Sequence, residues 1–94
     1  MPEMIFRVQW PDGALSDCYS PSLVVQEHLS VGAAYPVADF ARISRTALTI
    51  ASDRVAARYG FPCSRAARQI ADIDARAADF AEDPAALVRV VAFA

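Results

Sequence analysis

Lysine is absent from the 94-residue sequence, and so are long hydrophobic runs. The uninterrupted apolar stretches, such as residues 23–25 and 85–88, are far shorter than the roughly 20 residues that cross a bilayer. The start, Met1-Pro-Glu-Met, has no basic cluster followed by an apolar run, which is the pattern of a secretory signal. We therefore expect a cytoplasmic protein with no membrane partner.

Cysteine and histidine are scarce. Cys18 and Cys63 are far apart in the sequence, and His28 is the only imidazole. None of these residues has a partner at the short spacing that is typical of zinc ligands. We predict no metal and no cofactor, and in a reducing cytoplasm we expect both thiols to be free.

The charge is distributed unevenly. All nine basic residues are arginine, and the net charge of -2 gives no overall attraction to nucleic acid or anionic lipid. Residues 40–70 carry a net charge of +5, whereas residues 1–39 and 71–83 each carry -4. The sequence therefore predicts a basic middle segment between two acidic ones.

The composition is that of one compact domain covering residues 1–94. Hydrophobic residues make up 55% of the chain and charged residues 21%. Ordering a residue costs on the order of 1.5 kcal/mol, so a chain this short must bury most of its apolar side chains. This argues against a large catalytic cleft with its own lid.

The two ends of the sequence have strand patterns. Residues 4–10 alternate in polarity, the turn Pro11-Asp12-Gly13 follows, and residues 14–19 return along the first strand. Residues 87–93 are rich in valine and predict a third strand. The inward side of the first strand carries Met4, Phe6, Val8 and Trp10.

The middle of the chain has helical patterns. Ser20 followed by Pro21 predicts a short helix over 21–28, and residues 30–36 are expected to be a loop. Apolar spacing predicts a long helix over 37–59 ended by Gly60, and another over 64–81 begun by Ser64 as N-cap.

The order of these elements predicts the fold. We expect an α+β domain in which a three-stranded antiparallel sheet, built from the N-terminal hairpin and the C-terminal strand, is covered by a helical hairpin and one short helix.

Three charged residues stand out at helical spacing. At 100° per residue, Arg54 and Arg58 lie within the apolar side of the long helix, and Asp74 lies within that of the next helix. One hypothesis is an internal ion pair between Arg54 and Asp74 that fixes the register of the hairpin. The other is that these arginines face a partner subunit or bind an anionic ligand.

A second candidate lies at the start of the last predicted helix. Cys63, Ser64 and Arg65 place a thiol and a guanidinium where unpaired N–H groups lower the pKa of a thiol and attract anions. No histidine, asparagine or aspartate pattern completes a nucleophilic site, so a small residue in a capped turn is the simpler interpretation. A helix-turn-helix that binds DNA is a weaker alternative, because acids follow from Asp72 onward.

Local strings across nearly the whole chain resemble a known family. They are Val8-Gln-Trp-Pro-Asp-Gly, Cys18-Tyr-Ser-Pro-Ser-Leu-Val-Val, Tyr35-Pro-Val-Ala-Asp-Phe, Ser44-Arg-Thr-Ala-Leu, Ile50-Ala-Ser-Asp-Arg-Val and Tyr59-Gly-Phe-Pro-Cys-Ser-Arg-Ala. Together they resemble small bacterial nitrogen starvation response proteins. Such proteins are typically encoded beside a nitrilase, a radical SAM protein, an acetyltransferase, an AIR-synthase-like protein and a flavoprotein, in clusters linked to the use of nitriles or cyanide as nitrogen. The resemblance implies a pathway and no catalytic residues.

These observations lead to one main expectation and two alternatives. We expect a small accessory protein that binds an enzyme of the nitrilase-containing cluster or a small anionic metabolite. It is also expected to form a homodimer through a sheet edge or an apolar helix face. Arg54, Arg58, Cys63, Ser64 and Arg65 are the candidate binding residues. The alternatives are a small enzyme with an interfacial site at Cys63 and Arg54, and the DNA-binding protein.

Overall fold

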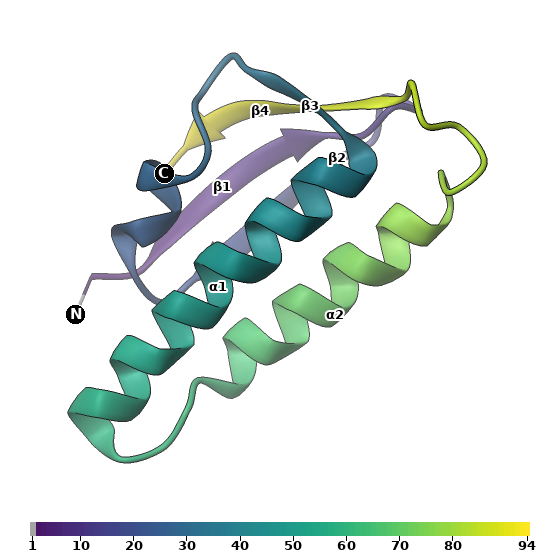
Figure 1. The fold of residues 1–94 in the computed structure, drawn as a ribbon. Coiled ribbons are helices and arrows are strands. Elements are labelled where there is room, and N and C mark those ends of the chain that lie inside the picture. The colour runs from purple at the N-terminus through teal and green to yellow at the C-terminus, as the bar shows by residue number, and fades with distance from the viewer. Residues whose placement is uncertain (1) are drawn as a thin grey trace.

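The computed structural model describes residues 2–94 and shows an α+β fold with two layers (Figure 1). An antiparallel sheet forms one layer, and the helices cover one of its faces. The predicted fold class is therefore confirmed. The elements are β1 (Met4–Gln9), β2 (Leu15–Ser20), η1 (Leu23–Glu27), β3 (Ala34–Pro36), α1 (Val37–Tyr59), α2 (Ser64–Ala78) and β4 (Leu87–Phe93).

The sheet has four strands and not the predicted three, in the order β2-β1-β4-β3. The extra strand, β3, comes from residues expected to form a loop. Its pairing with β4 is antiparallel, and the Gly32 N–H just before it donates to the Val90 carbonyl at 2.8 Å. A three-residue strand containing a proline is too short to show a period-2 pattern, which is why sequence reasoning missed it. As a result, β4 lies inside the sheet between β1 and β3.

The hairpin of β1 and β2 follows the sequence pattern closely. Its turn has the Gly13 N–H donating to the Trp10 carbonyl at 2.9 Å, with Gly13 at a φ of 90°. The Asp12 carboxylate accepts from the Ala14 N–H. The predicted inward side is buried, and it packs with Val88 and Val90 of β4 and with Phe40 and Leu48 of α1; its members are Met4, Phe6, Val8 and Trp10.

The short helix differs from expectation. It is a 3₁₀ helix, η1, that begins at Leu23 instead of residue 21. Its N-cap is Ser22, whose hydroxyl accepts from the Val24 N–H. The predicted cap, Ser20, instead donates its buried hydroxyl to the Ser22 carbonyl at 2.7 Å. Because this hydrogen bond holds residues 20–22 in a turn, the helix begins two residues further along the chain than predicted.

The two long helices form the predicted antiparallel hairpin. α1 has the predicted bounds, and Gly60 ends it with a φ of 91° and an N–H that donates to the Ala56 carbonyl at 2.8 Å. α2 ends at Ala78 and not at residue 81, because the chain turns there through Asp79 and Phe80. Its N-cap is Cys63, without a side-chain cap, so the predicted Ser64 cap is wrong. Within residues 2–94, none of the helices is both long and apolar enough to cross a bilayer.

The helical hairpin is longer than the sheet that it covers (Figure 1). The buried residues of α1 stop at Ala51, so its last eight residues contribute none to the core. The first buried residue of α2 is Ala66. We call residues 52–65 the hairpin tip. It extends past the end of the sheet, apart from Arg65, whose side chain contacts Tyr19 of β2, and it gives the molecule its elongated dimensions of 40 × 22 × 18 Å.

Both edges of the sheet are protected. At the β2 edge, the Tyr19 N–H donates to the Gln69 side chain of α2 at 2.9 Å. At the other edge, β3 is short and ends in Pro36, which has no N–H to offer. Because an incoming strand needs free N–H and C=O groups, these features disfavour the sheet edges as the route to a homodimer.

Candidate interaction site at the hairpin tip

All five candidate binding residues of the sequence lie in the hairpin tip, but on two different sides of it. Arg54 and Arg58 are one turn apart on α1. Cys63, Ser64 and Arg65 lie at the start of α2. The tip therefore unites these residues in one region without forming one site from them.

On the α1 side, Arg54 lies next to η1. One guanidinium nitrogen donates to the Ser22 hydroxyl at 3.2 Å. Arg58 places its guanidinium 5.7 Å from the centre of the Tyr59 ring. Both arginines are exposed, as is Leu23 at 42%, the residue after Ser22. Arg54, Arg58, Tyr59 and Leu23 are called the α1 tip face below.

The predicted ion pair between Arg54 and Asp74 is wrong. Asp74 instead pairs with Arg45, and Arg54 contacts Ser22. The apolar spacing places Arg54 on the side of α1 that faces the sheet, but the sheet has ended at that level. The spacing predicts a buried position for Arg54, but its side chain is solvated here. Its guanidinium therefore needs no buried partner.

On the α2 side, Arg65 joins a small cluster. Its guanidinium carbon lies 3.7 Å from the centre of the Tyr19 ring, and one of its nitrogens is 3.7 Å from a Glu3 carboxylate oxygen. The Tyr19 hydroxyl donates to Glu3 at 2.9 Å. This cluster fastens the start of α2 to β2 and to the chain before β1. Arg65 is thus occupied within the fold.

Burial and the hydrogen bond to Glu3 raise the pKa of Tyr19 to about 12. The phenol therefore keeps its proton at neutral pH and does not act as a general base there. The Cys63 N–H donates to the Ser52 hydroxyl at 3.1 Å, which closes the turn between α1 and α2.

Cys63 and Arg54 lie on different sides of α1. Cys63 contacts Ser52 of α1. Arg54, which contacts Ser22, is two residues after Ser52 and therefore points about 200° away from it around the helix. The geometry thus gives no support to a shared Cys63 and Arg54 catalytic site. The other thiol, Cys18, is buried, and burial together with the charges of Asp17 and Asp72 raises its pKa to about 12.

The helices of the hairpin lie side by side along their lengths (Figure 1). A helix-turn-helix crosses its two helices steeply, at about 90–120°. The basis for the DNA-binding alternative is therefore lost. Across residues 2–94, no group of three or more histidine, cysteine, aspartate or glutamate side chains could hold a metal ion.

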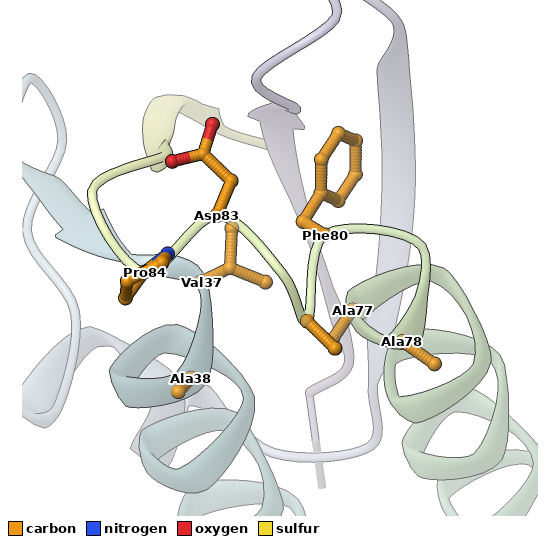
Figure 2. A pocket seen from close by; sticks show the side chains of 8 residues that line it. Val37, Ala38, Ala77, Ala78, Phe80, Asp83 and Pro84 are labelled. Atoms are coloured by element: carbon orange, nitrogen blue, oxygen red, sulfur yellow. The ribbon is translucent and has the colours of Figure 1, made fainter.

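A hollow of about 380 Å³ lies at the other end of the hairpin, between the start of α1 and the end of α2 (Figure 2). Small side chains from both helices leave the space, and the ring of Phe80 and the carboxylate of Asp83 stand at its border. The lining residues are Val37, Ala38, Ala77, Ala78, Phe80, Ala81, Asp83 and Pro84.

Sequence reasoning missed one polar cluster near this hollow. The Arg76 guanidinium carbon lies 5.4 Å from the centre of the Trp10 ring and 5.0 Å from that of Phe80, and it pairs with Asp12 and Asp79. The Trp10 and Phe80 rings are stacked with centroids 6.2 Å apart. This cluster joins the end of α2 to the β1–β2 turn. Its contacts link residues 64 positions apart, which no local pattern reveals.

Comparisons with known proteins gave one match. A family model described as nitrogen starvation-induced protein NitG matches residues 5–93. This range spans all of the strands and helices except the first residue of β1. No curated protein and no solved structure matches the chain significantly.

Proposed function

Because the chain belongs to the family of nitrogen starvation-induced protein NitG, we propose that it acts during nitrogen starvation as an accessory protein that binds another protein. The site of binding is the α1 tip face. The partner presents an acidic surface with an apolar centre, which complements two arginines beside exposed Tyr59 and Leu23.

The observation that carries this proposal is the length of α1. None of its last eight residues, 52–59, is buried, although packing supplies most of the stability of a helix in a protein. They present Tyr59 at 53% exposure together with two arginines. Tyrosine and arginine are enriched among the residues that dominate binding energy in interfaces. A two-turn extension of this kind is explained by recognition more readily than by folding.

The resemblance to proteins encoded beside a nitrilase supplies candidate partners. We propose an enzyme of such a cluster, the nitrilase first, as the protein that the tip binds. A small anionic metabolite is less well supported, because Arg54 and Arg58 stand on an exposed helix end and the hollow between the helices is lined by other residues.

The test uses the full chain and a matched pair of charge reversals. Arg58→Glu changes the α1 tip face, and Arg89→Glu makes the same change at an exposed position on β4. Binding of the purified cluster enzymes is measured by calorimetry, and affinity capture from nitrogen-starved cells is quantified by mass spectrometry. We expect one enzyme to bind, with its dissociation constant raised at least tenfold by Arg58→Glu and less than twofold by Arg89→Glu. Equal binding by both variants, or no partner in either experiment, would refute the proposal.

A further inference from the structure

The outer face of the helical hairpin, which points away from the sheet, has no cover within the chain. Its residues recur every three or four positions and are all exposed. We infer that two copies of the chain pair through this face, with their hairpins antiparallel about a two-fold axis perpendicular to the helices. The face comprises Ala38, Arg42, Thr46, Thr49 and Asp53 of α1, and Arg68, Ala71, Ala75, Ala78 and Asp79 at and after α2.

The charges on this face are complementary to themselves. On α1, Arg42 lies near the start and Asp53 toward the end; on α2, Arg68 lies near the start and Asp79 follows the last residue. When each helix meets its own copy in the antiparallel direction, Arg42 faces Asp53 and Arg68 faces Asp79, each twice. All four contacts join unlike charges.

One axis satisfies both helices at once. The midpoint between Arg42 and Asp53 falls between residues 47 and 48 of α1, and that between Arg68 and Asp79 falls between residues 73 and 74 of α2. These levels lie within one helical turn of each other in the fold, because Asp74 pairs with Arg45 across the hairpin. Asp53 and Arg68 form no ion pair with any of residues 2–94, so both remain available to a second copy. Arg42 and Asp79 form exposed pairs with Asp39 and Arg76 on their own helices or helix ends, which a second copy would share.

The shape of the face also suits a second copy. Alanine and threonine at its centre allow close approach of the helices. A face about 30 Å long and about 18 Å wide, from the helix rise and the spacing of packed helices, buries roughly 1,000–1,200 Å² over both copies. This area is near the lower limit of specific interfaces, so we expect a dissociation constant in the micromolar range.

The hollow and the turn at the tip complete the pairing. The same axis brings the turn of one copy, with Phe61 exposed at 67%, to the end of the hairpin where the other copy has its hollow (Figure 2). Phe61 is an aromatic side chain without cover, and the hollow is an apolar space bordered by alanines. Because tip and hollow lie at opposite ends of one hairpin, the two contacts form together and the assembly closes as a dimer.

This interface is separate from the α1 tip face. Arg54 and Arg58 lie on the opposite side of α1, the side that faces the sheet layer, at a height where the sheet itself has ended. Pairing therefore leaves both arginines free for the partner proposed above. The inference goes beyond the proposed function and does not depend on it.

The test is a charge swap followed by sedimentation equilibrium of the full chain. R42D/R68D makes all four contact positions acidic, and D53R/D79R makes all four basic. We expect the unaltered chain to dimerise at micromolar concentration, each variant to associate at least tenfold more weakly, and an equimolar mixture of the two to form a one-to-one heterodimer. Circular dichroism establishes that both variants are folded, which the exposure of all four positions predicts.

The mixture decides the outcome. If the folded variants stay monomeric when mixed, or if the unaltered chain is monomeric at 1 mM concentration, roughly a thousandfold above micromolar association, the inference is wrong. A dimer that persists in both variants but is lost in L15A/L87A, two exposed residues on the outer face of the sheet, would assign the interface to the sheet instead and would equally overturn it.

Discussion

The division of α1 into a core part and a projecting part predicts unequal effects of two truncations in the same helix. Leu48 is fully buried among the core residues, whereas Tyr59 is 53% exposed in the hairpin tip. Leu48→Ala removes three carbon atoms, worth roughly 0.8 kcal/mol each by transfer. The cavity that remains raises the total to about 3–4 kcal/mol.

The consequence is large for a chain of this size. A 94-residue domain has a free energy of unfolding of roughly 5–14 kcal/mol, so Leu48→Ala removes a substantial fraction of it. The melting temperature should fall by about 12–30 °C. Tyr59→Ala, by contrast, should change the free energy of unfolding by less than about 0.5 kcal/mol.

Urea unfolding followed by circular dichroism at low protein concentration measures both values. The unaltered chain and both variants should share one m-value, since the same surface is exposed on unfolding. The reasoning fails if Tyr59→Ala costs as much as Leu48→Ala, because the tip would then be part of the cooperative core.

Three further predictions concern groups whose environments the fold sets. Since the hydrogen bonds from Arg76 and from the Ala14 N–H lower the pKa of Asp12, its contribution to stability is present above the unfolded value near 4 and is lost as pH falls through the lower folded value. Asp12→Asn should therefore reduce the melting temperature at pH 6, and this reduction should shrink as the pH falls below about 4; a reduction that does not change with pH would contradict the reasoning. The native chain should react with one equivalent of an alkylating agent at Cys63 and with a second, at Cys18, only in urea; rapid labelling of Cys18 would contradict its burial and its pKa of about 12. Gln69→Ala should speed hydrogen exchange at the Tyr19 amide about tenfold, from the loss of one hydrogen bond, with the Gly13 amide as an internal control; an unchanged Tyr19 rate would show that Gln69 does not protect the edge.

Much of the fold was predictable because its signals are local. The bounds of α1 follow from apolar spacing and from Gly60, and the β1–β2 turn follows from Pro11-Asp12-Gly13. The strand β3 was not predictable, because three residues show no periodicity and their pairing depends on β4, which comes about fifty residues later.

The candidate site was only partly predictable for a different reason. The angular positions of Arg54 and Arg58 on α1 can be calculated, but where the sheet ends relative to the helix cannot. Asp74 meets Arg45 instead of Arg54, because the tight turn that Cys63 and Ser52 close sets the offset between the helices. Such offsets depend on tertiary contacts, which the spacing of residues within one helix does not encode.

The order of the strands in the sheet also constrains how the protein folds during synthesis. β1 and β2 form a local hairpin, and α1 and α2 form another, so each can form from contacts that are close in the sequence. The sheet cannot close at that stage, because β4 lies between β1 and β3 and is translated after every other element. Until β4 emerges, the inner faces of both hairpins remain without their central strand, and the nascent chain depends on rapid completion or on chaperones to avoid aggregation.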